Sequence, residues 1–91
     1  MAKITGSSTQ LTSIVNDEVV PNAPVDWINA YYAFYKFVFT NDIACTIKIN
    51  GGDPIYLAAN QGFTIEKGDL VVTSFVVVTV GVKYTWVGYY Y

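Results

Sequence analysis

The chain has 91 residues and a net charge of −2, with five Lys, seven Asp or Glu, and neither Arg nor His. Because 53% of its residues are apolar and only 13% are charged, it is not an intrinsically disordered chain. A single Cys without any His excludes a Cys/His structural zinc site, a disulfide framework within one copy and a His-based catalytic triad. A negative chain without Arg is poorly suited to neutralising phosphates, so we expect no nucleic-acid partner.

The apolar content exceeds what a free-standing small domain normally shows. The charged fraction of 13% is about half the usual ~25%, so we expect apolar surface to be buried against other copies or another protein. The longest strongly apolar run, residues 70–82, is shorter than the roughly 20 residues of a spanning helix. The polar start lacks the apolar stretch of a signal peptide. We therefore expect an unprocessed product made in the cytoplasm, with no membrane partner.

Branched residues dominate the sequence: Val, Ile and Thr number thirty, against three Leu and seven Ala. Such residues suit pleated strands and lose rotamer freedom in helices. Turn residues separate short runs every 8–12 residues or so, which favours an all-β fold. We predict a small antiparallel sandwich or jelly-roll-like barrel of about seven or eight short strands. Residues 1–10 are predicted to form a polar N-terminal arm, and residues 11–91 a single β domain.

The first third of the chain is the least regular. Residues 9–15 and 19–20 are predicted to form a hairpin around Asn16-Asp17-Glu18, and the prolines of residues 21–24 indicate a loop. One turn of helix is expected over residues 26–30. An aromatic strand is predicted over residues 31–40, closed by a turn at Asn41-Asp42.

The pattern is clearer from residue 43 onward. Apolar and polar side chains alternate over residues 43–50, which predicts a half-buried strand. The turn Asn50-Gly51-Gly52-Asp53-Pro54 leads to a short strand at 55–57, and a third short strand at 63–65 lies between two further turns. Residues 70–80 are apolar on both faces, which predicts a long central strand covered on both sides. The last strand is predicted over residues 82–87.

Few residues offer reactive chemistry. The carboxylates fall in predicted turns, where solvation and Asx turns account for them, and nothing places two of them together as in a glycosidase. They are Asp17, Glu18, Asp26, Asp42, Asp53, Glu66 and Asp69. The turn at 50–53 lacks the alternating acids of a calcium loop, and Cys45 has no His to activate it, so we interpret it as a core residue. We expect no catalytic residue, no metal, no cofactor and no enzymatic activity.

The aromatic residues gather in two runs, 31–39 and 84–91. Both faces of the predicted strand 31–40 carry large rings, so we expect one face to be covered from outside the domain. Tyr and Trp are enriched at interfaces because they bury a large area and keep a polar tip. Three roles remain open: core packing, a subunit interface and a carbohydrate platform. The interface candidates are Tyr31, Tyr32, Tyr35, Phe37, Phe39, Trp86, Tyr89, Tyr90 and Tyr91.

The segment from Cys45 to Tyr90 resembles small β-structured virion proteins of tailed bacteriophages. The resemblance lies in IKINGGDPIYLAANQGFTIEKGDLVVTSFVV, followed by GVKYTWVGYY. In such proteins a hairpin of this type leads through a glycine turn to a long strand, and an aromatic final strand closes the sheet. The resemblance implies a capsid-associated, decoration or fibre-base protein, and it implies no enzyme active site.

We therefore expect a structural virion protein of a bacteriophage, which decorates or stabilises the capsid or forms a fibre base. Its expected partners are the major capsid or fibre protein and itself, as a homo-oligomer such as a trimer, with an N-terminal arm docked to a capsid or tail protein. Its expected location is the virion, after synthesis in the host cytoplasm. The alternative is a carbohydrate- or receptor-binding module that stacks host glycans on Tyr84, Trp86 and residues 89–91.

Overall fold

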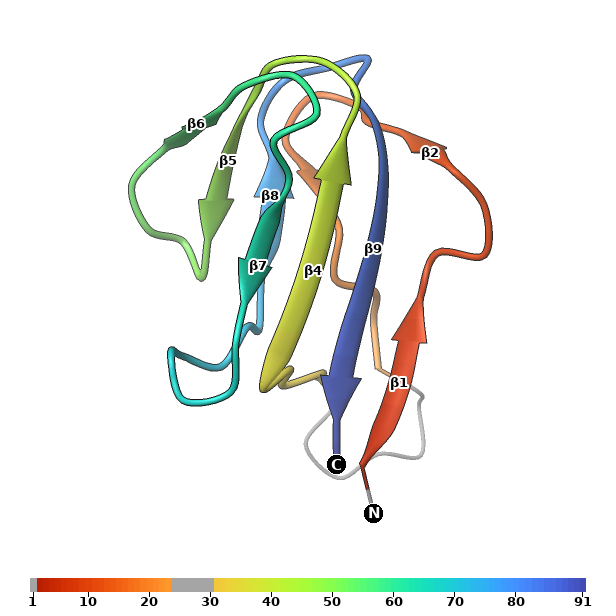
Figure 1. The fold of residues 1–91 in the computed structure, drawn as a ribbon, viewed down its shortest axis with the longest axis vertical. Coiled ribbons are helices and arrows are strands. Elements are labelled where there is room, and N and C mark those ends of the chain that lie inside the picture. The colour runs from red at the N-terminus through yellow and green to blue at the C-terminus, as the bar shows by residue number, and fades with distance from the viewer. Residues whose placement is uncertain (1, 24–30) are drawn as a thin grey trace.

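The computed structural model describes residues 2–23 and 31–91, which form two antiparallel sheets (Figure 1). Sheet A has the strand order β1-β9-β4-β7, with β2 also paired to β9, and sheet B has the order β3-β8-β5-β6. The strands are β1 (Lys3–Gly6), β2 (Leu11–Thr12), β3 (Asp17–Glu18), β4 (Lys36–Asn41), β5 (Cys45–Ile49), β6 (Ile55–Leu57), β7 (Phe63–Ile65), β8 (Phe75–Val77) and β9 (Lys83–Tyr90). The predicted all-β sandwich is confirmed. This part of the chain has nine strands and no helix, and the helical turn predicted at 26–30 lies outside it.

The strand pairs are nested along the chain. β5 pairs with β6, β4 with β7 and β3 with β8, while β1 and β2 both pair with β9. With β1 and β2 counted together as the first strand, this nesting is the pairing order of a jelly roll. Because the first strand pairs with the last, the two ends of the chain lie side by side at one end of sheet A (Figure 1).

Aromatic rings fill the space between the two sheets. Phe37 and Phe39 of β4 point inward from sheet A, Phe75 of β8 points inward from sheet B, and none of the three has exposed surface. The centroid of the Phe75 ring lies 4.9 Å from that of Phe37 and 4.8 Å from that of Phe39. Trp86 of β9 stacks on Phe37 at 5.7 Å. These ring contacts join the sheets into one core.

Residues 70–80 do not form the long central strand that their apolar pattern predicted. Only β8 is a strand, and both ends of the run are exposed. Val72 and Phe75 are both fully buried although they lie three positions apart, so the alternation shifts by one residue between them. Oδ1 of Asn50 accepts hydrogen bonds from the backbone N–H groups of the two residues in between, at 2.9 and 3.1 Å. These side-chain bonds take the place of a strand ladder there.

Residues 9–20 do not form a hairpin. β2 pairs with β9 in sheet A, whereas β3 pairs with β8 in sheet B, so the chain crosses between the sheets. Ser13 holds this crossing in place. Its buried Oγ donates to the Thr79 carbonyl at 2.7 Å and accepts from the Val82 N–H at 2.9 Å. The partners of this segment lie more than 60 positions later in the chain, so local polarity alone could not reveal them.

Part of the predicted N-terminal arm, Lys3–Gly6, forms β1 of sheet A. β1 is an edge strand that pairs with the C-terminal half of β9, from Lys3 opposite Tyr90 to Gly6 opposite Val87. The backbone of this strand is thus engaged within the domain, and the docking of the segment to a capsid or tail protein stays a prediction.

β9 continues past its predicted end through Gly88. The ring of Phe34 lies against this glycine, and a Cβ at this position would lie 2.6 Å from the ring carbons. A residue without a side chain therefore lets the ring close over the strand. Phe34 itself precedes β4 and forms an isolated bridge with Val72, so the predicted strand 31–40 begins only at Lys36.

The role of Asn50 can be isolated by replacement with glycine. Asn50 has a φ of 52°, which glycine adopts freely, so Asn50→Gly removes only the side-chain hydrogen bonds. We expect the free energy of unfolding, measured by urea denaturation, to fall by about 1–2 kcal/mol because the bonded N–H groups lose their acceptor. Asn60→Gly is the matched control, since Asn60 has a φ of 60° and an exposed side chain. An equal loss in both variants would contradict this role.

Candidate functional site

Four of the nine predicted interface residues are core residues. Their exposed fractions are at most 9%, and they are Tyr32, Phe37, Phe39 and Trp86. The sequence pattern placed rings on both faces of one unbroken strand. Instead the chain bends at Tyr35, so that Phe34 and Phe37 both point inward. The expectation that these four rings contact a partner is corrected, because their surface is already covered within the domain.

Three of the remaining candidates form an aromatic group at the surface, in which Tyr91 is exposed and Tyr35 and Tyr89 are half-buried. Tyr35, Tyr89 and Tyr91 lie together at the end of β9, and we call them the tyrosine cluster. The Tyr35 ring stacks on Tyr91 with centroids 4.6 Å apart and lies 6.2 Å from Tyr89. Tyr91 is 69% exposed, and Tyr31 is also exposed, whereas Tyr90 turns inward and packs edge-on against Tyr32. The predicted C-terminal aromatic surface is thus smaller than expected.

Two lysines lie over the tyrosine cluster. Nζ of Lys36 is 5.2 Å from the centre of the Tyr89 ring, and Nζ of Lys67 is 5.9 Å from that of Tyr35. Both distances allow cation–π attraction. No local pattern pointed to Lys67, because the turn that carries it follows β7 and meets Tyr35 only in the folded sheet.

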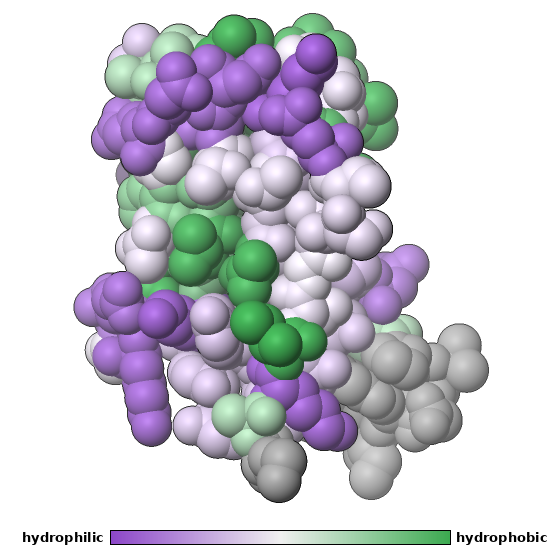
Figure 2. All heavy atoms as spheres, turned by 45° about the vertical axis from the view of Figure 1, so that its right-hand side comes forward, coloured by the Kyte–Doolittle hydropathy of each residue, from purple (hydrophilic) through white to green (hydrophobic). Residues whose placement is uncertain are grey.

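A second exposed apolar group lies at the other end of β9. Ile14 and Val15, in the crossing between β2 and β3, and Val80, in the turn before β9, are all exposed. Backbone bonds connect these segments, from the Gly81 N–H to the Ser13 carbonyl at 2.8 Å and from the N–H of residue 16 to the carbonyl of residue 78 at 3.3 Å. We call Ile14, Val15 and Val80 the apolar tip. Figure 2 shows hydrophobic residues at this upper end and in a strip across the face below it.

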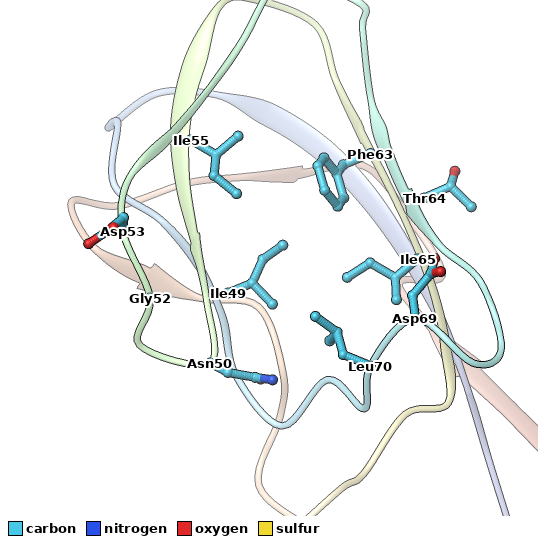
Figure 3. Close-up of a pocket in the computed structure, with 10 residues that line it drawn as sticks. All are labelled: Ile49, Asn50, Gly52, Asp53, Ile55, Phe63, Thr64, Ile65, Asp69 and Leu70. Carbon is cyan, nitrogen blue, oxygen red and sulfur yellow. The ribbon is translucent and has the colours of Figure 1, made fainter.

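A groove opens along the side of the sandwich, between β7 at the edge of sheet A and β6 at the edge of sheet B. Its volume is about 450 Å³. Figure 3 shows apolar side chains converging on it from both sheets and from the segment after β7; they are Ile49, Ile55, Phe63, Ile65 and Leu70. Asn50, Gly52, Asp53, Thr64 and Asp69 complete its lining. Local sequence patterns do not reveal this groove, because its walls come from turns and strands that are separate along the chain.

Four of the carboxylates accept hydrogen bonds from backbone N–H groups; they are Asp17, Glu18, Asp42 and Asp69. Glu18, expected in a turn, lies in β3, where it accepts hydrogen bonds from the Ser74 hydroxyl at 2.5 Å and the Phe75 N–H at 2.9 Å. Oδ1 of Asp42 accepts from the Lys83 N–H at 2.9 Å. Residues 2–23 and 31–91 contain no group of three His, Cys, Asp or Glu side chains placed to hold a metal ion. Asp26 lies outside these residues.

Cys45 lies on the buried face of β5, as predicted. Its exposed fraction is 3%, and burial, together with the charge of Asp42, raises the pKa of its thiol. A raised pKa lowers the thiolate fraction and with it the nucleophilicity of the sulfur. Cys45 is therefore placed as a packing residue.

Tyr84 and Trp86, two members of the predicted carbohydrate platform, face the core with exposed fractions of 4% and 6%. The Tyr84 hydroxyl donates to Oδ2 of Asp17 at 3.2 Å. Burial and the Asp17 carboxylate raise the pKa of Tyr84 to about 12. Any stacking surface on this strand is therefore limited to the residues after Gly88.

Comparison with protein-family models, curated proteins and solved structures gives no match to this chain. Within its described residues, the protein has no helix of the length and apolarity needed to cross a membrane.

Alkaline titration tests the buried position of Tyr84. An unfolded Tyr loses its proton near pH 10, whereas folded Tyr84 keeps it to about pH 12. Over this interval the unfolded state binds fewer protons, so stability falls as the pH rises. We expect Tyr84→Phe to reduce this fall in urea denaturation between pH 10 and pH 12. The exposed control Tyr56→Phe should leave it unchanged, and an unaltered slope for Tyr84→Phe would count against the assignment.

Proposed function

We propose that the protein is a structural component of a tailed-bacteriophage virion, which decorates or stabilises the capsid or forms a fibre base. Two points support this. The segment from Cys45 to Tyr90 resembles small virion proteins, and the nested strand order is that of the jelly rolls used by many viral capsid proteins. A fold hosts many functions, so the strand order supports the proposal by analogy and the exposed surface carries it.

The observation that carries the proposal is the position of the exposed apolar residues. β9 begins just after Val80 of the apolar tip and ends just before Tyr91 of the tyrosine cluster. One exposed aliphatic surface and one aromatic surface therefore lie at opposite ends of the same strand. Tyr side chains give large contact areas at low entropic cost, and two separate contact surfaces allow a subunit to bridge neighbours in an assembly. The tyrosine cluster is the surface proposed for contacts between copies, in a homo-oligomer such as a trimer.

Sedimentation velocity of the full chain at micromolar concentration tests the proposed self-association. We expect an oligomer for the natural sequence and a smaller species for Tyr89→Ser/Tyr91→Ser, because the double substitution removes the exposed Tyr91 ring and the half-buried Tyr89 ring. Tyr56→Ser is the control, since Tyr56 is as exposed as Tyr91 but lies on β6 of the other sheet. A monomer at every concentration would rule out the homo-oligomer.

The virion assignment needs a separate experiment. The reading frames beside the coding sequence should encode capsid, portal or tail proteins, and mass spectrometry of particles purified from that phage should detect the chain in stoichiometric amounts. Particles that lack the chain would overturn the assignment.

A carbohydrate- or receptor-binding module remains the second candidate, on a reduced surface. The exposed Tyr91 ring, backed by Tyr35, is the observation that favours it. A glycan array with Tyr91→Ala as control separates the two candidates, because only a glycan-binding module gives a signal that the substitution removes.

A further inference from the structure

β1 is held to the sandwich by its backbone more than by its side chains. It lies at the edge of sheet A and pairs with β9 alone. None of its four residues belongs to the core cluster of the described chain, and Ile4, its one large apolar side chain, is 60% exposed. Detachment of such a strand exposes little apolar surface, so it costs less free energy than opening the core does. β1 can therefore leave β9 while the aromatic core stays packed.

The segment after β1 contains slack. Ser7 continues the pairing, because its N–H donates to the Trp86 carbonyl at 3.1 Å and its Oγ accepts from the Trp86 N–H at 3.2 Å. β2 resumes the pairing at Tyr84, so the exposed residues 8–10 face only Thr85. Figure 1 shows this connection swinging away from β9. Fully extended, three residues span about 10 Å, whereas one residue of β9 rises about 3.4 Å. We call residues 8–10 the hinge.

The chain is anchored beyond the hinge. The Ser13 N–H donates to the Val82 carbonyl at 2.8 Å, and the buried Ser13 hydroxyl donates to the Thr79 carbonyl at 2.7 Å. These bonds fix the chain directly after β2. Opening that begins at β1 therefore ends at the hinge, and residues 3–7 form a strand that can move as a unit.

We propose that residues 3–7 are exchanged between two copies of the chain, so that β1 of each copy pairs with β9 of the other. The occupant follows from the structure, because the edge of β9 already binds this segment, from Lys3 opposite Tyr90 to Gly6 opposite Val87. The same strand pairing forms in the closed and the exchanged states, which makes exchange a low-cost route to a dimer.

The concentration of the chain decides between the two states. A short flexible connection holds β1 near its own β9 at an effective concentration in the millimolar range, so copies must be brought equally close for exchange to compete. Crowding of copies in an assembly provides that condition. The exchange goes beyond the proposed function, since it requires neither a virion location nor the tyrosine cluster, and either proposal can fail while the other stands.

A reversible lock on β1 tests the exchange. Ile4 and Tyr89 lie directly opposite each other in the ladder, so Ile4→Cys/Tyr89→Cys brings two thiols within reach of a disulfide. Oxidation at low micromolar concentration should close this bond within each chain. The same variant kept reduced is the matched control, and Cys45 remains buried in both samples. Each sample would then be concentrated to about 1 mM and its mass measured by light scattering after size exclusion.

We expect a dimer in the reduced sample and only monomer in the oxidised one, because the lock prevents β1 from leaving. Oxidation of the reduced dimer should link its chains in pairs on a denaturing gel. Equal dimer in both samples would assign the association to surface contacts and overturn the exchange. Monomer in both samples would overturn it as well.

The hinge provides a second test. Deletion of Ser8 and Thr9 leaves one residue opposite Thr85, which makes β1 and β2 a continuous strand with unchanged alternation. One residue cannot bridge the β9 strands of two copies, so we expect the deletion to abolish the dimer at about 1 mM. Ser8→Gly/Thr9→Gly keeps the length of the hinge and should retain the dimer. A dimer that persists in the deletion variant would contradict the exchange of residues 3–7.

Discussion

The packing of Phe75 against Phe37 and Phe39 is the contact on which this sandwich depends. Most strands are only two to six residues long, so backbone ladders within each sheet give limited stability. Complete burial of a Phe side chain contributes about 1.5–3 kcal/mol, and these rings reach across from both sheets. Trp86 extends the same layer along β9. The long final strand and the short strands around it are therefore held against one another mainly by the aromatic core.

Polar side chains fix the irregular segments around that core. Ser13 holds the crossing between the sheets, Asn50 holds the segment before β8, and Glu18 bonds the first backbone N–H of β8. Asn41 is buried and bonds the carbonyl of residue 58 and the N–H of Gly62, which fixes the turn between β6 and β7. Because side chains satisfy the backbone in these places, the segments need no neighbouring strand, and some of their apolar residues stay at the surface. The apolar tip and the groove both arise in this way.

The sequence predicted the regular part of the molecule well. The strands 55–57 and 63–65, the turns that flank them and the buried position of Cys45 were confirmed, because alternation and turn residues act over a few positions. The candidate site was predicted only in part. Tyr91 is exposed and Tyr89 is half-buried, whereas Phe37, Phe39 and Trp86 are in the core. For Phe37 and Phe39 the reason is the bend at Tyr35, which places them on the same face as Phe34.

Local composition by itself determined that this chain forms strands, where several of them turn, and that its apolar content exceeds the norm for a small domain. Tertiary structure decided which strands share a sheet, where the alternation shifts and which aromatic rings remain exposed. The reason is the range of the forces involved. Branching and turn propensity act between near neighbours, whereas the bonds from Ser13 to Thr79 and from Asn50 to Thr73 join residues 66 and 23 positions apart. The surplus of apolar residues noted in the sequence is thereby resolved into a ring-filled core, a tyrosine cluster, an apolar tip and a groove.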